Sequence, residues 1–532
     1  MSNGSSIVSP LPPGWGLAEL AKIARINPAL DCPNPREEEV VVNFVPMRAV
    51  EPEGGGLLRP EMRPYGKVKK GYTAFQSGDV IMAKITPCME NGKTTVVPDL
   101  PGTICFGSTE FHVLRAEKGI EPKWLANFLL QHEVRRAAQR KMTGGVGQMR
   151  VPASFLENAT IPVAPFAEQQ RIIDAVDELL SDVDAGVAAL HRVQKKLAQY
   201  RAAVLKAAVE GALTEDWRGQ HSHSESAHVL LTRILDDRRS RWEQDQLLKF
   251  ASAEKEPPKQ WKAKYKEPVT PDTSKLPVLP SGWCWTTLDQ LCFEIRNGYS
   301  LKPDAEQGIP ILRISSVRAL CVDLTDVRYL SATSSDYAEF LVATGDLLFT
   351  RYNGTRSLVA VCGVVPEIES PLVHPDKLIR GRMGSELTLS GYVGIASNTG
   401  MSRKFLESKI RTTAGQAGVS GGDIKRTPIP LPPLGEQEVV IAEVEAQLSI
   451  IDHLKADLES KLRNSKGLRQ AILRDAFAGH LEAQDENDEP ASELLKRIAT
   501  QRERRTGRST PAWKGPAEKP LKQIAVLSRK DR

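Results

Sequence analysis

The chain contains 532 residues, of which 41% are hydrophobic and 26% are charged, and its formal net charge is +5. This length exceeds the usual size of one domain, and the hydrophobic content is ample for more than one core, so we expect at least two domains. The net charge is mild, and much of it is concentrated in residues 496–532. It therefore excludes a globally basic protein that wraps nucleic acid.

Residues 1–165 form the first predicted domain. Short β-rich runs at 39–45, 79–85 and 109–114 alternate with glycine and proline breaks, and residues 122–141 form a plausible helix. Strands and helices mixed in this way are typical of an α+β domain.

A long helix is predicted for residues 166–213, because hydrophobic residues recur along it at heptad spacing. The first-turn acid Glu168 suits the positive end of a helix, and Gly211 is placed to end it. About 45 residues at 1.5 Å each give a rod of roughly 65 Å. The heptad series is Val176, Val183, Leu190, Leu197 and Val204, with Ile172, Leu179, Val193 and Tyr200 in the alternating positions.

The same organisation returns 268 residues later. Leu-Pro-x-Gly-Trp occurs at 11–15 and again at 279–283. Repetition at a fixed offset indicates a duplicated structural unit, here a second domain at 277–434 followed by a second long helix at 435–482. The second heptad series keeps the register with one polar position: Val444, Ile451, Leu458, Ser465 and Ile472.

A heptad seam has to pair with another helix, and a partner in the same register lies within the chain. The predicted fold is therefore α+β, with two β-rich globular domains separated by two long antiparallel helices that form an intramolecular coiled coil of pseudo-twofold symmetry. The alternative is that each amphipathic helix lies on its own globular domain. Two copies in one register favour the mutual pair.

Residues 214–276 and 483–532 are predicted to be extended connectors. The first is polar, carries one short amphipathic helix at 227–242, and then becomes rich in lysine and proline. A run similar to its residues 230–234 follows the second helix at 494–498. The basic C-terminal tail beyond is predicted to be disordered, with contact to nucleic-acid backbone as a weaker alternative.

The common marks of catalysis are missing from the sequence. Residues 87–94 end in Gly-Lys-Thr but have proline where a phosphate loop needs its first glycine, so Asn91-Gly92 is interpreted as a tight turn. There is no GxGxxG after a strand, no HExxH, no GxSxG and no Asn-Pro-Pro-aromatic tetrad. We therefore predict a chain that is non-catalytic and binds no cofactor.

Metal and membrane signals are also missing. The seven cysteines occur singly, without a CxxC pair or matching histidines, so a zinc site is not expected and the thiols are interpreted as reduced core residues. Residues 1–16 have neither a basic nor an apolar run, and no later stretch approaches the roughly eighteen apolar residues of a membrane helix. We expect a cytoplasmic protein.

A turn that ends in a cation is repeated in both domains. Residues 77–84 return as residues 344–351, and in each a Gly-Asp turn leads into an apolar strand followed by Lys84 or Arg351. The stretches between these anchors and the long helices are much less alike. The strand and turn segments are thus duplicated, whereas the sequence between them and the long helices has diverged.

Polar and cationic residues on turns are the candidates for DNA contacts. Arg and Lys can pair with guanine edges, Asn and Gln with adenine, and further cations hold phosphates. Any one of them alone is better explained as an ordinary surface residue, but groups recur at matching places. The candidates are Tyr65, Lys67, Lys69, Lys70, Tyr72, Lys84, Asn91, Lys93, Gln148 and Arg150 in the first domain, and Arg296, Asn297, Tyr299, Lys302, Arg351, Asn353, Thr355, Arg356, Gln416, Ser420 and Lys425 in the second.

With these motifs in place, the chain resembles the specificity subunits of type I restriction-modification systems. The resemblance rests on the Leu-Pro-x-Gly-Trp openings, on the Gly-Asp turns with residues 84–93 and 350–354, and on Pro-x-x-Pro-x-x-Glu-Gln at the start of both helices. It covers about residues 10–500. It implies two target recognition domains, each reading half of a split DNA site, with the helix pair setting the spacer.

The resemblance also implies the partners. Two modification subunits would carry S-adenosylmethionine and methylate adenine, and restriction subunits would carry ATP- and Mg-dependent translocation and cleavage, so none of these activities lies in this chain. A duplicated body on a pseudo-dyad independently predicts two equivalent faces for two copies of one partner. Half-sites read by such a body would lie about one DNA turn apart, near 34 Å.

Three alternatives remain open from the sequence. The chain could serve a different bipartite restriction enzyme in which one partner combines cleavage and methylation. It could be a coiled-coil scaffold that binds only protein, with the turn cations merely solvated. A cryptic enzyme is the third alternative, and the missing motifs argue against it.

Overall fold

The computed structural model describes residues 11–31, 35, 37–101, 104–145, 147–221, 225–300, 302–331, 335–384, 386, 388–413 and 415–506. These fall into two compact units: unit 1 comes from residues 1–191 and 459–532, and unit 2 from residues 192–458. Each unit combines a β-rich lobe with about half of each long helix, because each half packs on the adjoining lobe. This division cuts through both helices, which the sequence analysis treated as separate segments.

The first lobe, in unit 1, contains sheets of strand order β2-β9-β6-β7 and β4-β3-β8-β5 and the ladder β1-β10. The strands predicted at 39–45, 79–85 and 109–114 correspond to β3, β6 and β9. The helix predicted at 122–141 is two helices, because Gln131 between them has an extended backbone. The elements are β1 (Gly16–Glu19), α1 (Leu20–Ile23), β2 (Ala24–Ile26), β3 (Val41–Val45), β4 (Glu61–Pro64), α2 (Tyr65–Val68), β5 (Thr73–Gln76), β6 (Val80–Ala83), β7 (Thr94–Val96), β8 (Ile104–Gly107), β9 (Phe111–Ala116), α3 (Pro122–Leu130), α4 (His132–Arg140), α5 (Ala153–Asn158) and β10 (Thr160–Val163).

The second lobe, in unit 2, repeats part of this plan. Sheet β12-β20-β17-β19 matches β2-β9-β6-β7, and ladder β11-β23 matches β1-β10, whereas the smaller sheets β13-β16, β14-β15 and β18-β22-β21 differ. The elements are β11 (Cys284–Thr287), α9 (Leu288–Leu291), β12 (Cys292–Asn297), β13 (Ile309–Leu312), β14 (Val317–Arg318), β15 (Cys321–Val322), β16 (Val327–Leu330), β17 (Leu347–Thr350), β18 (Tyr352–Asn353), β19 (Cys362–Val364), β20 (Leu378–Met383), α10 (Ser390–Asn398), α11 (Gly400–Lys409), β21 (Arg411–Thr413), β22 (Gln416–Gly418), α12 (Gly421–Lys425) and β23 (Pro428–Leu431).

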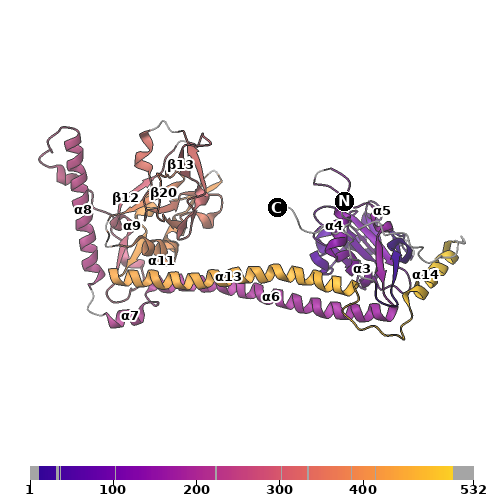
Figure 1. The fold of residues 1–532 in the computed structure, drawn as a ribbon. Coiled ribbons are helices and arrows are strands. Elements are labelled where there is room, and N and C mark those ends of the chain that lie inside the picture. Colours follow the sequence, from indigo (N-terminus) through magenta and orange to yellow (C-terminus); the bar gives the residue numbers. More distant parts are fainter. Residues whose placement is uncertain are drawn as a thin grey trace, which may run out of the picture. The chain divides into compact units, whose positions relative to one another are not determined.

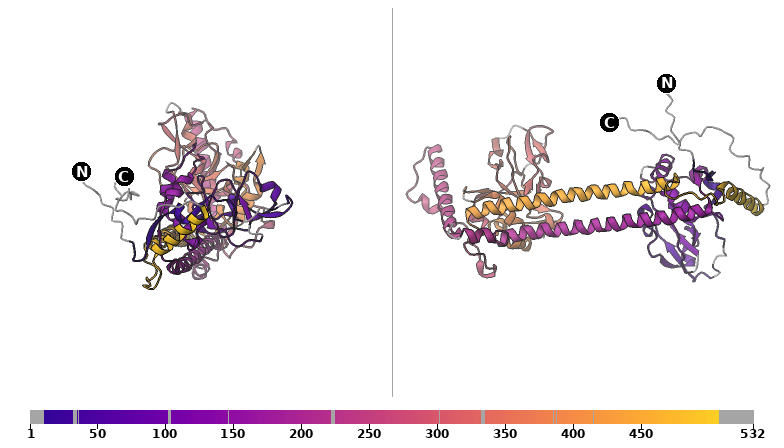
Figure 2. Two further views of the ribbon diagram at one scale, coloured as in Figure 1. Left: turned by 90° about the vertical axis from the view of Figure 1, so that its right-hand side faces the viewer. Right: turned by 60° about the horizontal axis from the view of Figure 1, so that its bottom comes forward.

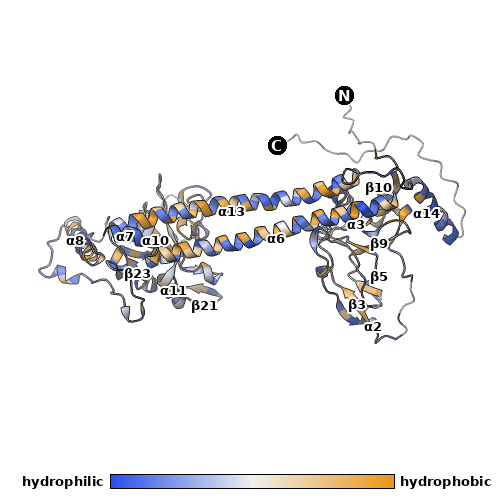
Figure 3. Cartoon of the chain, turned by 90° about the horizontal axis from the view of Figure 1, so that it is seen from below, coloured by the Kyte–Doolittle hydropathy of each residue, from blue (hydrophilic) through white to orange (hydrophobic). Residues whose placement is uncertain are grey.

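Two long helices, α6 (Phe166–Glu210) and α13 (Leu434–Phe477), run antiparallel and confirm the predicted pair (Figures 1 and 2). In unit 1 the start of α6 shares a buried cluster with the end of α13, and Arg469 forms an ion pair with Asp184. In unit 2 the end of α6 packs with the start of α13, and the Tyr200 hydroxyl donates to Gln447 at 3.0 Å. Hydrophobic residues follow both helices along their length (Figure 3).

Of the two predicted heptad positions, the second leaves the seam after its first residue. In the first series Val176 and Val204 are buried. In the alternating positions Ile172 is buried as well, whereas Leu179, Val193 and Tyr200 are 39%, 44% and 47% exposed, so the prediction is wrong for these three. Residues at i+3 and i+4 lie on either side of residue i along a helix face. The partner helix lies on the i+4 side, which Leu180 occupies, packed against the core of unit 1.

The internal repeat extends to individual hydrogen bonds. Trp124 donates its indole N–H to the Pro162 carbonyl at 3.0 Å, and 268 residues later the Tyr392 hydroxyl donates to the Pro430 carbonyl at 2.7 Å. A buried glutamine in the first turn of each long helix also makes matching bonds. Gln169 accepts from the Glu121 amide at 3.1 Å, and Gln437 accepts from the Leu389 amide at 3.0 Å.

The amphipathic helix predicted at 227–242 is confirmed and is longer, and a second helix follows the second long helix, so neither connector is extended throughout. After the short helix α7 (Glu215–Gln220), α8 (Ala227–Ser252) buries Leu230 and Ile234 in unit 2, and α14 (Ala491–Thr506) buries Leu494 and Ile498 in unit 1. Beyond α8 the chain folds back, and the rings of Trp261 and Tyr265 lie 5.8 and 5.3 Å from Trp242. The part of the predicted tail after residue 506 lies outside the described residues.

The start of each long helix carries a buried glutamate in a different charge setting. Glu436 accepts from Thr214 at 2.6 Å and from the Trp283 indole at 2.7 Å, and also pairs with Arg218. Among the described residues, oxygen Oε1 of Glu168 is buried without a hydrogen-bond partner, and burial raises the pKa of this carboxyl. The ionised form of Glu168 is therefore disfavoured in the folded state.

We expect Glu168→Gln and Glu436→Gln to have opposite effects on stability. Because the folded pKa of Glu168 is raised, its contribution is fully present below the ordinary carboxyl pKa and is lost as pH rises through the folded value. Glu168→Gln removes that loss, so unit 1 should gain stability relative to wild type as pH rises above the ordinary carboxyl pKa. Glu436→Gln removes the charge partner of Arg218 and should destabilise unit 2 at pH 7. Hydrogen exchange of the two helix starts measures both, and equal effects would contradict the assignment.

Among the described residues, no helix combines the length and apolar character needed to cross a membrane, and no group of three or more His, Cys, Asp or Glu could hold a metal ion. Four cysteines are buried, namely Cys105, Cys284, Cys292 and Cys362. Cys321 is exposed, so the interpretation of all thiols as core residues is wrong for it. Cys32 lies outside the described residues.

Candidate nucleic-acid interface

Both Gly-Asp turns are held by an arginine, which is buried in the first lobe and half-buried in the second. Asp79 accepts two bonds from Arg115, at 2.6 and 2.7 Å. Asp346 accepts two from Arg382, at 2.9 and 2.7 Å. Each aspartate also accepts an amide three residues before it, which closes the turn. The strands β6 and β17 that follow are buried throughout and are thereby fixed at one end.

At the other end of these strands lie the two cations, beside a second repeated segment. The Lys84 carbonyl accepts from the Val151 amide at 2.8 Å, and the Arg351 carbonyl accepts from the Val419 amide at 3.0 Å. The segments joined in this way are the loop before residue 151 and the hairpin β21–β22. Each lobe therefore brings its strand-end cation next to the same kind of loop.

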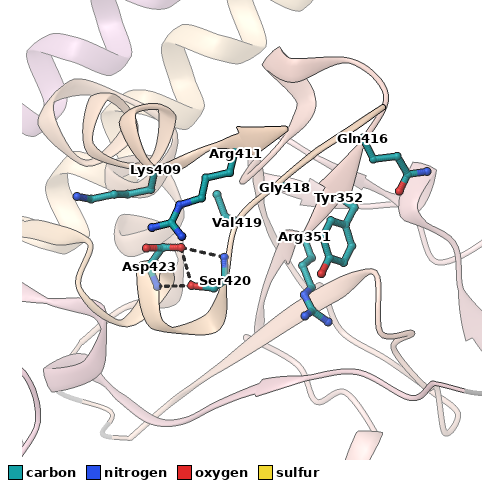
Figure 4. Close-up of a pocket in the computed structure, with 9 residues that line it drawn as sticks. All are labelled: Arg351, Tyr352, Lys409, Arg411, Gln416, Gly418, Val419, Ser420 and Asp423. Atoms are coloured by element: carbon teal, nitrogen blue, oxygen red, sulfur yellow. Dashed lines mark hydrogen bonds between the residues drawn. The ribbon is translucent and has the colours of Figure 1, made fainter. Parts of the chain in front are cut away.

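In the second lobe this junction forms a hollow of about 260 Å³. In Figure 4, Lys409 and Arg411 lie together on one side, and Gln416, Tyr352 and Arg351 lie on the other. The Arg351 guanidinium is 4.7 Å from the Tyr352 ring. The charged and amide side chains that line the hollow are thus three cations, one carboxylate and one amide, and the hollow is open to solvent. Its lining residues are Arg351, Tyr352, Lys409, Arg411, Gln416, Gly418, Val419, Ser420 and Asp423.

Several predicted contact residues are exposed, as a DNA-contacting side chain would need to be. They do not form one group, since in the first lobe they come from α2 and from separate loops. Tyr72 is 40% exposed and packs edge-on against Phe44 at 4.9 Å. Lys84 is half-buried. The exposed ones are Lys67, Lys69, Lys70, Tyr72, Asn91, Gln148, Asn297, Lys302, Thr355, Arg356, Gln416 and Ser420.

Some candidates in the first lobe are engaged within the protein. The Lys93 ammonium donates to the Met47 carbonyl at 3.0 Å, and Arg150 makes two bonds to Glu110 at 2.9 and 2.8 Å. Lys69 pairs with Glu38, and the Tyr65 ring packs on Phe106 at 5.7 Å. These contacts give Lys93 and Arg150 a role in holding the lobe together.

In the second lobe the same is true of more candidates. Tyr299 is only 8% exposed in an apolar cluster, so its proposal as a surface contact is wrong. Arg296 pairs with Glu339 at 2.9 Å, and Arg356 donates to carbonyls at the end of α11. The remaining three also have local partners: Asn353 accepts from the Thr355 amide, Ser420 caps α12, and Lys425 lies 3.5 Å from Asp289.

Sequence reasoning missed Lys409 and Arg411, which line the hollow, and Lys141, which occupies the position of Lys409 in the first lobe. Lys141 and Lys409 are separated by the repeat offset of 268 and each lies at the end of a helix, Lys141 directly after α4 and Lys409 as the last residue of α11. A search for identical polar residues at that offset would have found the pair. Arg411 has threonine, Thr143, at the matching position, so repetition carries no signal for it.

Together these features define a duplicated α+β protein with two lobes that present the same strand-end cation and loop amide in different surroundings. No protein-family model matches the chain. It is 29% identical over 494 residues to the EcoEI specificity subunit of Escherichia coli (87% of this chain, 82% of that protein). It is also 29% identical over 515 residues to the EcoKI specificity subunit of E. coli K12 (92% and 96%).

Two solved structures share the fold. A chain of a type I restriction-modification system matches with a TM-score of 0.58 at 21% identity, over 88% of this chain and 99% of that one. The HsdS subunit of Thermoanaerobacter tengcongensis matches with a TM-score of 0.50 at 21% identity, over 88% and 98%. The chain belongs to the specificity subunits of type I restriction-modification systems. It is a DNA sequence-recognition subunit of such a system.

Proposed function

We propose that each lobe is a target recognition domain that reads one half of a bipartite DNA site, and that this non-catalytic chain directs adenine methylation and cleavage by its partners. The observation that carries this proposal is the duplicated junction of strand-end cation and exposed glutamine, Lys84 with Gln148 and Arg351 with Gln416. Cations position a protein on phosphates, and amides read base edges. Two such junctions on one chain supply two reading surfaces.

The partners in this proposal are two modification subunits, which bind S-adenosylmethionine, and restriction subunits, which use ATP and Mg. Exposed apolar residues on the long helices support docking there: Leu179 and Leu468 in unit 1, and Val193, Ile450 and Leu454 in unit 2. Exposed apolar side chains on a surface are typical of protein contacts. Because the helix pair is internally repeated, one partner type can bind twice, and Tyr200 and Leu468 are exposed at equivalent positions of the two helices.

The helix pair is proposed to set the spacer between the half-sites. Gly186 in α6 and Gly467 in α13 are suited to insertions, because a Cβ at either position meets nothing within 4 Å. Inserting one heptad at both keeps the seam in register and lengthens the pair by about 10 Å, which is roughly three base pairs of DNA. The expected methylated motif has unchanged half-sites and a spacer about three base pairs longer. A motif with unchanged spacing would contradict the proposal.

Mapping of modified adenines in the host genome, with and without the gene, tests the function itself. We expect a split motif that vanishes on deletion. Purification with natural partners distinguishes a type I complex from an enzyme in which one partner both cleaves and methylates. A protein-only scaffold would be indicated if the assembled complex bound DNA without preference for one bipartite sequence at any salt concentration.

A further inference from the structure

Three polar positions around the loop junction are of the same kind in both lobes. The first position directly follows a buried strand, the second lies at the C-terminal end of a helix, and the third follows a glycine with left-handed backbone. The matched positions are Lys84 and Arg351, Lys141 and Lys409, and Gln148 and Gln416, separated by 267 or 268 residues.

The two glutamines stand on the same local backbone. Gly147 precedes Gln148 with φ +80°, and Gly415 precedes Gln416 with φ +79°, a conformation that glycine adopts at low cost. Cross-strand pairing supports both loops, between Thr143 and Arg150 in the first lobe and between β21 and β22 in the second. Both glutamine side chains are exposed. The shape that presents the amide is therefore duplicated along with the amide.

The residues around the glutamines are not duplicated. Tyr352 stands where the first lobe has Ile85, and Gly418 stands where it has Arg150. These differences are coupled, because a Cβ at position 418 would lie 2.4 Å from the Tyr352 ring. The first lobe has no ring there and accommodates Arg150, which pairs with Glu110. The glutamine and the backbone that presents it are thus repeated in both lobes, whereas the residues around the glutamine differ.

Under the proposed function, each half-site has to contain an adenine that a modification subunit methylates, and the unmatched surroundings of the two glutamines suit half-sites that otherwise differ in sequence. We infer that Gln148 and Gln416 contact the adenine–thymine pair that both half-sites share, while their unmatched neighbours read the bases that differ. A glutamine amide can bond adenine N6 and N7 in the major groove. Lys141 and Lys409 would hold flanking phosphates. This inference rests on the proposed function.

The test uses the complex assembled with its modification subunits, and DNA in which 7-deazaadenine replaces the shared adenine of one half-site, which removes N7. Gln148→Ala is expected to weaken binding to natural DNA about 5- to 150-fold, the range for one bidentate base contact. It should cause little further loss on DNA already substituted in its own half-site. Gln416→Ala should behave in the same way for the other half-site only.

Lys141→Ala and Lys409→Ala are the matched controls. A phosphate contact should weaken binding evenly on natural and substituted DNA and reduce the salt dependence by about one ion. Glutamine variants that bind like wild type, or that lose affinity equally on both DNAs, would overturn the inference and leave the proposed function intact. A wild-type complex without preference for any bipartite site would overturn both. Unchanged thermal unfolding of the variants excludes misfolding as the cause.

Discussion

Asp79→Ala is expected to destabilise unit 1 by about 3 kcal/mol, the lower end of the 3–5 kcal/mol typical of breaking a buried ion pair. The side chains of Arg115 and Asp79 are only 7% and 1% exposed. Without the carboxylate, the guanidinium keeps the Ala29 carbonyl and the half-exposed Asp31 as partners, which is why the lower end applies. The Gly-Asp turn also loses the acceptor for the Gln76 amide.

This loss of stability is measured by denaturant unfolding and by hydrogen exchange of the backbone amides in β6 and β9. The double variant Asp79→Ala, Arg115→Leu is the control, because removing both charges eliminates the orphaned guanidinium and should recover much of the stability. A loss of stability below about 1 kcal/mol for the single variant would show that the Arg115–Asp79 pair contributes no more than a surface ion pair does. In that case the Gly-Asp turn would not be what holds β6.

Phe477→Ala is expected to cost about 3–5 kcal/mol, as large-to-small changes of buried aromatic residues do. Phe477 lies at the end of α13 in unit 1, is 7% exposed, and its ring is 4.4 Å from Trp124 and 5.8 Å from Phe128. The lost contacts join the helix to the lobe. We therefore expect fast exchange in the last two turns of α13.

The repeat supplies a matched comparison for this prediction. Val209 occupies the equivalent position at the end of α6 in unit 2 and is 5% exposed. Because it loses only two methyl groups, Val209→Ala should cost about 1–2 kcal/mol, and its effect should be limited to unit 2. Equal losses for the two variants would show that the aromatic cluster adds nothing to the anchoring of α13.

The long helices and the duplicated frame could be predicted because their signals are periodic. A heptad series written twice at one offset is visible without structure, and so is the turn before each buried strand. The choice between i+3 and i+4 for the second seam position was not predictable, because it depends on the side from which the partner approaches. The contacts of Trp242 with Trp261 and Tyr265 follow no sequence periodicity. They lie in a polar stretch of the chain and were therefore not predicted.

The candidate site was predicted less well than the fold. Exposed and internally paired cations have the same sequence signature, since the partner of Arg150 is Glu110, forty residues away. Tyr299 appeared to be a turn residue, and only tertiary packing shows that it is buried. The pair Lys141 and Lys409 was available in the repeat itself, because both the residue type and the preceding helix recur.

The packing of α14 on the first lobe has a consequence for biosynthesis. The Ala491 amide donates to the Gly14 carbonyl at 2.8 Å, so the two extremes of the described chain meet in one unit. Unit 2 is continuous in sequence, whereas unit 1 waits for residues made after position 458. Although domains usually fold from the N-terminus first on the ribosome, here the half translated first is completed last, and a message cut short before α14 leaves it without its closing helix.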